Sequence, residues 1–260
     1  MQTIVLKFGG ASVANIKNIL KIADIIIDRS KVYKNILVVV SAMGKTTNKL
    51  INLAKRINEN PSKREQDMLI SVGERISMAL LCMALEKKGK DAISFTGSQS
   101  GIITNDDHLQ AKILDVKPFR ILDSLNKGKI VIVAGFQGVS LSKEITTLGR
   151  GGSDTSAVAL GISLNADCIE FYKDVIGIYN KDPKKYSDAV FLSELSFEKA
   201  LDIIEKSQHH ILHPRSVRLA EKNNLDLIIR SFKNYKKNKI FTIIKKEVSK
   251  KVNNIVYEEV

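Results

Sequence analysis

The first residues with a recognisable chemical pattern are Lys7, Gly9 and Gly10, which end and follow the first apolar segment of the chain. Paired glycines let the backbone approach a ligand with its N–H groups outward, and a helix that starts near Ala14 adds a positive dipole end. Together with the lysine they predict an anion site. The spacing matches neither GxxxxGK[ST] nor GxGxxG, and a strand followed by a tight turn with a solvated lysine is the alternative interpretation.

The segment GRGGSDTSAVALG, from Gly149 to Gly161, is a more specific pattern. Arg150 stands among three glycines, and Ser153 and Asp154 open a helix of small residues. One turn thus presents backbone donors, a guanidinium fork and a carboxylate. Helix capping explains Ser153 or Asp154 but does not explain Arg150, so the segment predicts a second part of an anion or carboxylate site.

Short apolar segments alternate with segments of helical periodicity along the chain. The expected strands are Thr3–Leu6, Ile36–Ser41, Asp91–Phe95, Lys129–Ala134, Cys168–Lys173, Leu225–Ser231 and Ile240–Ile244. The expected helices are Ile16–Ile27, Lys49–Ile57, Gln66–Lys88, Pro118–Leu125, Ser153–Leu164, Ser196–Ser207 and Pro214–Asn223. This alternation predicts an α/β fold, a three-layer α/β/α sandwich around a mainly parallel sheet.

In such sheets ligands bind at the carboxyl ends of the strands. The loops that follow the first, second, fourth and fifth expected strands are KFGGAS, SAMGKTTN, GFQGVS leading to GRGGSDTS, and YKDVIGIYNKDP. All four are glycine-rich or polar. We therefore expect them to converge at one edge of the sheet and to form one site.

Length and composition limit the class of protein. The 260 residues are 44% hydrophobic, enough for one large domain or two small ones. Cys82 and Cys168 stand in apolar settings and are expected to be buried thiols, without a disulfide or metal role. Without a signal-like N-terminus or an apolar run of about 18 residues, we expect a cytoplasmic protein with no membrane partner.

The net charge of +13 raises the question of nucleic-acid binding, because the stretch from Lys233 to Lys251 holds eight lysines. These lysines alternate with Asn and Ile, and no nucleic-acid motif accompanies them. We interpret the charge as a general residue bias that can attract anionic substrates, and we expect no nucleic-acid partner.

Six segments resemble, in order, the signature segments of the aspartate kinase catalytic domain within the amino-acid kinase superfamily. They are KFGGASV, VVVSAMGKTTN, SVGERIS, TLGRGGSDTSA, YKDVIGIYNKDP and ILHPRS, from Lys7 to Arg215. The resemblance implies transfer of the γ-phosphoryl group of ATP, with Mg²⁺, to the β-carboxylate of L-aspartate. The product, 4-phospho-L-aspartate, leads to lysine, threonine and methionine. The resemblance also favours a homodimer.

The resemblance gives roles to residues at the matching positions. Lys7 would contact the ATP phosphates with backbone amides from Gly9 and Gly10, and Asp154 would orient Lys7. These two side chains would be the catalytic pair. Phosphoryl transfer needs positioning and charge neutralisation, so no protein nucleophile is required.

On the substrate side, Arg150 would pair with a carboxylate of aspartate, and Glu74 would attract its α-ammonium group. Thr47, Phe136 and Ser153 would line the same pocket. From the residues alone, the alternative interpretation of Glu74 is a helix-surface glutamate paired with a nearby Lys or Arg.

The nucleotide contacts implied by the resemblance are Lys173, Asp174, Tyr179, Lys184 and His210, beside Lys7, Gly9 and Gly10. Three positions depart from the family pattern. Lys173 replaces a common threonine, Ile176 replaces acidic or small residues, and His210 replaces a lysine that often precedes LHP. No protein ligand is assigned to Mg²⁺, because phosphate oxygens and water hold much of its coordination shell.

The resemblance divides the single kinase domain into a substrate lobe over about 1–167 and a nucleotide lobe over about 168–260. The chain stops about where the family continues into ACT domains, so we expect a catalytic domain that lysine or threonine does not inhibit, with a separate regulatory subunit left open. Two other classes also stay open. One is another kinase of the superfamily, for glutamate, N-acetylglutamate, carbamate or uridylate, and the other is a non-catalytic ligand-binding relative.

Overall fold

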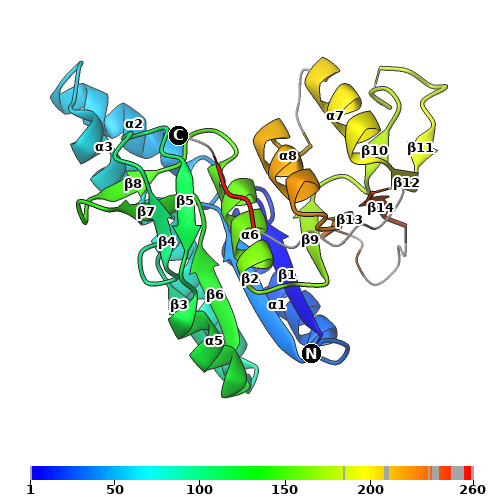
Figure 1. Cartoon of the computed structure of the whole chain (residues 1–260), viewed down its shortest axis with the longest axis horizontal. Helices are drawn as coiled ribbons and strands as arrows, with labels where there is room; N and C mark the ends of the chain where they lie inside the picture. The colour runs from blue at the N-terminus through cyan, green and yellow to red at the C-terminus, as the bar shows by residue number, and fades with distance from the viewer. Residues whose placement is uncertain are drawn as a thin grey trace.

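The computed structural model describes residues 2–183, 185–207, 211–233, 235, 240–246 and 255–258. One eight-stranded sheet runs through it (Figure 1). In spatial order its strands are β12 (Glu194–Leu195), β14 (Thr242–Ile244), β13 (Leu227–Ser231), β9 (Cys168–Lys173), β1 (Thr3–Phe8), β2 (Asn35–Val40), β6 (Ile130–Ala134) and β3 (Ala92–Phe95). Every neighbouring pair is parallel except β13 with β14.

Helices cover both faces of this sheet. The helices α1 (Ile16–Arg29) and α4 (Val72–Lys87) pack on the face that carries Leu6 and Phe8 of β1. The helices α5 (Phe119–Asn126), α6 (Gly152–Ser163), α7 (Phe197–Lys206) and α8 (Pro214–Lys222) pack on the face that carries Val5. Successive side chains of a strand point to opposite faces, so a strand buried on both sides is apolar throughout. The structure confirms the predicted three-layer α/β/α fold.

A second, smaller sheet packs against α3 and α6. Its order is β5 (Ile113–Val116), β4 (Ile102–Thr104), β7 (Gln137–Ser140) and β8 (Ile145–Thr147). The sequence did not predict it, because strands of three or four residues separated by turns leave no apolar run. The GFQGVS segment, interpreted as a loop, contains β7. A further two-stranded ribbon, β10 (Ile178–Tyr179) with β11 (Phe191–Leu192), was missed for the same reason.

The helix expected over Gln66–Lys88 is interrupted. It is divided at Ser71 into α3 (Lys63–Ile70) and α4, while α2 (Thr46–Ile57) precedes both. By length and composition the stretch Lys63–Lys87 is apolar enough to cross a membrane, but 56% of its most apolar window is buried inside the protein. Packing of α4 against β2, β3, β6 and α1 accounts for this apolar character.

A buried carboxylate ties α1 to the sheet. Glu170 of β9 is fully buried and binds the Arg29 guanidinium at 2.6 Å and the Arg230 guanidinium at 3.1 Å. The Tyr172 hydroxyl donates a hydrogen bond to its other oxygen at 2.7 Å. This cluster joins α1, β9 and β13 on the face opposite α6.

We predict that Glu170→Ala destabilises the protein by about 3 kcal/mol, because it leaves two poorly exposed guanidinium groups without their counter-ion. Urea unfolding measures the change. The control is Asp123→Ala, which removes an exposed partner of Lys127 at 2.7 Å and should alter stability by less than about 0.5 kcal/mol. Equal effects of the two substitutions would contradict the structural role given to Glu170.

Candidate active site

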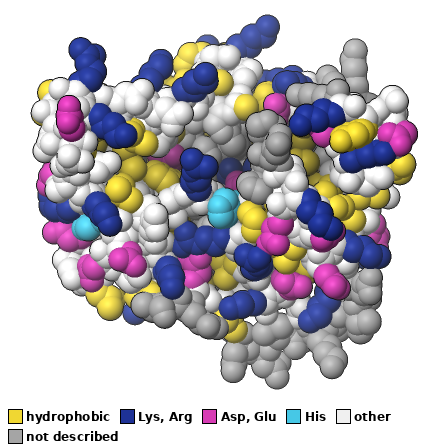
Figure 2. Space-filling view, turned by 90° about the horizontal axis from the view of Figure 1, so that it is seen from above, with side chains coloured by type: hydrophobic (Ala, Val, Ile, Leu, Met, Phe, Trp, Pro, Cys, Tyr) yellow, Lys and Arg dark blue, Asp and Glu magenta, His cyan; other side chains and the backbone are white. Residues whose placement is uncertain are grey.

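The polar loops predicted to converge do meet at the carboxyl edge of the large sheet. The Gly44 amide, from the SAMG loop after β2, donates to the Gly10 carbonyl of the loop after β1 at 3.1 Å. A side chain at Gly10 would press on backbone oxygens of Ala42 and Gly44 at 3.1 and 3.2 Å, so the glycine permits this approach. Figure 2 looks down on this edge and shows basic and acidic side chains together around a hollow in the middle of the face.

Two lysines share one carboxylate at this edge. Lys7 Nζ lies 2.5 Å from Asp154 Oδ1, and Lys173 Nζ lies 3.1 Å from Asp154 Oδ2. The sheet explains the arrangement, since β1 and β9 are parallel neighbours with Lys7 opposite Phe171. Lys173 follows Phe171 by two residues and therefore faces the same side as Lys7.

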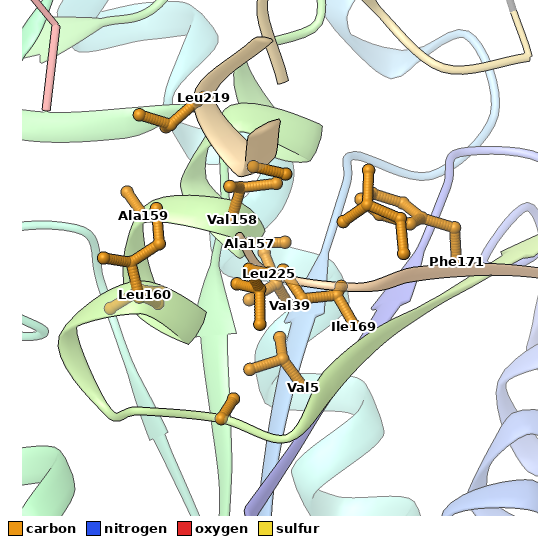
Figure 3. Packing of buried hydrophobic residues seen from close by; sticks show 14 of the residues in the cluster. Val5, Val39, Ala157, Val158, Ala159, Leu160, Ile169, Phe171, Leu219 and Leu225 are labelled. Atoms are coloured by element: carbon orange, nitrogen blue, oxygen red, sulfur yellow. The ribbon is translucent and has the colours of Figure 1, made fainter. Parts of the chain in front are cut away.

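The small residues of α6 bring Asp154 to the lysines. Ala157 and Val158 are fully buried and pack against Val5, Val39 and Ile169 of the strands below, as Figure 3 shows. Short side chains let the helix axis lie close to the sheet, and Asp154 stands in its first turn. The N-terminal end of α6 is thereby held directly over the end of β1.

The electrostatics of the pair follow from burial. Lys7 is 2% exposed and Asp154 is 7% exposed. Burial lowers the pKa of Lys7, although the charge of Asp154 opposes the shift, and the charge of Lys173 adds to it. Burial alone would raise the pKa of Asp154, but the charges and hydrogen bonds of Lys173 and Lys7 together hold it well below its usual range. One carboxylate between two ammonium groups leaves a net positive site.

Glu74 lies near this group, in the first turn of α4. It is 3% exposed, and its Oε1 accepts a hydrogen bond from the Ala42 amide at 2.9 Å. Its Oε2 is buried and has no hydrogen-bond partner among the described residues. Burial raises the pKa of Glu74 to about 7, with the Ala42 amide and the charge of Lys7 opposing the shift. The alternative of a helix-surface glutamate is therefore wrong.

The GRGG turn presents Arg150 to solvent. Gly149 and Gly151 adopt left-handed backbone angles, with φ of 70° and 71°, and Arg150 between them is exposed. Ser153 is 9% exposed at the start of α6, and its Cβ would contact any side chain placed at Gly135. The glycines thus turn the chain sharply between β8 and α6 with Arg150 at the apex.

Phe136 precedes β7 with a φ of 71°, a rare angle for a bulky residue. Its amide donates to Ser156 Oγ at 3.0 Å, and its carbonyl accepts from the Leu148 amide at 2.9 Å. These bonds fix the strained backbone against α6, where a Cβ on Gly152 would lie 3.0 Å from Phe136 Cδ2. Strain of this kind is found at functional sites, and the sequence offered no sign of it. Thr47 is half-buried in the first turn of α2.

The expected nucleotide contacts are less completely placed. Asp174 is exposed directly after β9, and Tyr179 is half-buried in β10 with its ring edge-on to Phe191 at 5.4 Å. Gly9 lies beside the Lys7 side chain, since a Cβ placed on Gly9 would be 3.9 Å from Lys7 Nζ. Lys184 and His210 lie outside the described residues.

The sequence analysis missed the support beneath the GRGG turn. Asp67 of α3 is fully buried and binds Thr147 Oγ1 at 2.5 Å, His108 Nδ1 at 2.8 Å and the Leu109 amide at 3.1 Å. The carbonyl of Leu109 lies against Gly149. An acidic residue on the otherwise apolar side of a helix was the available signal. Cys82 and Cys168 are buried thiols, as predicted.

Fold and site together define a three-layer α/β protein with two lysines on one buried carboxylate at the carboxyl edge of its sheet. Comparison with known proteins identifies the family, because the profile of the amino acid kinase family matches residues 2–231. The chain belongs to the amino acid kinase family.

Three relatives illustrate the similarity. An aspartokinase of Geobacillus stearothermophilus is 46% identical over 256 residues, which cover 98% of this chain and 62% of that protein. The crystal structure of aspartate kinase from Synechocystis matches with a TM-score of 0.81 and 40% identity, over 96% of this chain and 41% of that one. Aspartokinase III of E. coli in complex with aspartate and ADP matches with a TM-score of 0.84 and 26% identity, over 95% and 65%.

This chain therefore spans about six tenths of the length of its similar curated relatives. Among the residues that the structure describes, no group of three His, Cys, Asp or Glu side chains is arranged to hold a metal ion.

We predict a pH-dependent gain in stability for Glu74→Gln. Burial raises the pKa of Glu74 from its ordinary value of 4.5 to about 7 in the folded protein, so the folded state loses stability as pH rises between these values. The gain relative to wild type should be larger by about 3 kcal/mol near pH 8 than near pH 4. Urea unfolding at both pH values measures it.

The control is Glu198→Gln, an exposed glutamate in the first turn of α7. It should change stability little at either pH. A gain for Glu74→Gln that is the same at both pH values would contradict a buried carboxyl whose pKa is raised by burial.

Proposed function

We propose that the protein is an aspartate kinase, an ATP-dependent phosphotransferase acting on the β-carboxylate of L-aspartate. The single observation that carries the proposal is the buried carboxylate of Asp154 shared by Lys7 and Lys173, at 2.5 and 3.1 Å. The similarity to proteins named aspartokinase, over 98% of this chain at 46% identity, supports the choice of substrate.

In the proposed reaction, an oxygen of the aspartate β-carboxylate attacks the γ-phosphorus of ATP, the bond to the bridging oxygen breaks, and ADP leaves. Negative charge on the transferring group must be neutralised throughout. Lys7 and Lys173 do this from one side, with amides of Gly9 and Gly10 beside them. Asp154 holds both ammonium groups in place, so little reorganisation accompanies the transfer.

Aspartate is proposed to bind between the GRGG turn and the start of α4. Arg150 pairs with a substrate carboxylate, and Glu74 receives the α-ammonium group through its unpartnered oxygen. A pKa of about 7 leaves Glu74 only partly ionised near neutral pH. A cation bound beside it favours the ionised form. Thr47, Phe136 and Ser153 line the remaining wall.

ATP is proposed to lie over the end of β9, where Asp174 and Tyr179 follow Lys173. The E. coli relative was solved with ADP and aspartate, which supports the choice of nucleotide. Both oxygens of Asp154 already face lysines, so this site fits a Mg²⁺ ion bound mainly by phosphate oxygens and water. When bound, Mg²⁺ neutralises part of the phosphate charge.

The division into lobes over about 1–167 and 168–260 is part of the proposal. Asp154 belongs to the first lobe and Lys173 to the second, so their ion pair at 3.1 Å would join the two at the reacting group. A homodimer and a cytoplasmic location, both expected from the sequence, stay predictions. Light scattering of the purified protein measures the first.

We predict that the chain forms aspartyl hydroxamate from ATP, Mg²⁺, aspartate and hydroxylamine, and that Lys7→Met lowers kcat by about 100-fold or more. The lost ammonium group is one that meets the transferring charge. Lys17→Met, an exposed lysine of α1, should leave kcat unchanged. Glutamate, N-acetylglutamate, carbamate and UMP serve as competing acceptors, with ADP release as the readout, and preference for any of them over aspartate would overturn the substrate.

A second prediction concerns Arg150. Arg150→Ala should raise KM for aspartate about 10- to 100-fold with a smaller change in kcat, because it removes pairing made already in the ground state. Arg150→Lys keeps the charge but cannot make two parallel hydrogen bonds to a carboxylate, so its KM for aspartate should lie between those of wild type and Arg150→Ala. Initial rates over a range of aspartate concentrations at saturating ATP measure both. An unchanged KM in the alanine variant would remove Arg150 from the substrate site.

A further inference from the structure

Arg215, in the ILHPRS motif, has no role in the function proposed above, yet its guanidinium reaches the base of the GRGG turn. Nη1 donates to the Leu148 carbonyl at 2.5 Å, and Nη2 donates to the Ala111 carbonyl at 2.7 Å. Leu148 and Ala111 are 1% and 0% exposed. Arg215 belongs to α8, so a side chain of the second lobe holds the segment of the first lobe that leads directly into Gly149 and Arg150.

The same motif supports the other end of the turn. A Cβ on Gly151 would lie 2.2 Å from the Cβ and Cγ of His213, so the turn rests on the histidine side chain. His213 Nδ1 in turn accepts a hydrogen bond from the Arg215 amide at 3.3 Å. The start of α8 and the GRGG turn therefore pack as one unit, although about 60 residues separate them.

The charge of Arg215 is balanced by Glu258. The two side chains pair through two bonds, one from Nη2 to Oε2 at 2.5 Å and one from Nε to Oε1. Glu258 Oε2 also accepts from the Ile113 amide of β5 at 2.7 Å. Only 22% of the Arg215 side chain and 12% of the Glu258 side chain are exposed, so each depends on the other for compensation.

Glu258 is carried by the segment 255–258, which is anchored at a second point. The Asn223 side chain donates to the Val256 carbonyl at 2.8 Å and accepts from the Val256 amide at 3.0 Å. Figure 1 shows the segment in red, running from the end of α8 to β5 across the layer that holds α6. The segment thereby connects Asn223 and Arg215 of the second lobe to Ile113 of the first.

We propose that the Arg215–Glu258 pair is a positioning unit that sets the GRGG turn, and with it Arg150, for binding the carboxylate substrate. Arg215 touches no substrate in this scheme. It acts through its hydrogen bond to the Leu148 carbonyl, and Glu258 holds the guanidinium in the orientation that makes this bond. The identity of the substrate in this inference rests on the proposed function. The coupling between the Arg215–Glu258 pair and the GRGG turn rests on the contacts described above.

The experiment compares Glu258→Ala with wild type in the full chain. Loss of the counter-ion frees the fork and loosens the turn, so KM for aspartate should rise about tenfold while KM for ATP and kcat change less than about twofold. Amide exchange of the peptide over residues 147–152, followed by mass spectrometry, should become about tenfold faster. Glu258→Gln, which keeps a side-chain acceptor for Ile113, should show smaller shifts in the same direction.

The matched control is Arg218→Ala, one turn further along α8, whose exposed side chain pairs with Glu205. It should alter neither KM nor exchange. Unchanged KM for aspartate and unchanged exchange in both Glu258 variants would overturn the inference, as would equal rises in KM for aspartate and ATP. If wild type does not phosphorylate aspartate, the proposed function fails, and the exchange measurement alone decides whether the pair holds the turn.

Discussion

The carboxylate of Asp154 is the point at which three elements of the structure are held together. It takes Lys7 from β1 on one oxygen and Lys173 from β9 on the other, while α6 supplies the carboxylate. Placing three charges in a buried position costs solvation, and only close pairing offsets it. The parallel pairing of β1 with β9, the small residues of α6 and the glycine turn before it all serve this geometry.

The strand β9 contributes to two charged clusters, one on each face of the sheet. Each cluster joins one carboxylate to two cationic side chains, but the two have different roles. Glu170, on one face, lies between two arginines under α1, and Lys173, on the other face, completes a group of two lysines and one carboxylate. The first cluster is enclosed within the sheet and α1, so its charges only hold elements together. The second lies where the strands end, so its surplus positive charge faces the loops in which an anion can bind.

The site also depends on contacts between distant parts of the chain. The turn that carries Arg150 rests on Leu109 and the buried Asp67 on one side and on His213 and Arg215 on the other. A short exposed turn between two left-handed glycines has little stability of its own. Its position is therefore a property of the surrounding shell, and the residues of that shell belong to any account of substrate affinity.

The sequence by itself determined the layer order, most strands of the large sheet and the loops that meet at its edge. Apolar strands that alternate with amphipathic helices are a local signal, and so are glycine-rich turns. It also named Lys7 and Asp154. Only the tertiary structure decided that Lys173 shares the Asp154 carboxylate, that Glu74 is buried and that Arg215 supports the GRGG turn. These three features depend on which distant residues become neighbours in the fold and on how far water is excluded from them. A local sequence pattern encodes neither the neighbours nor the burial.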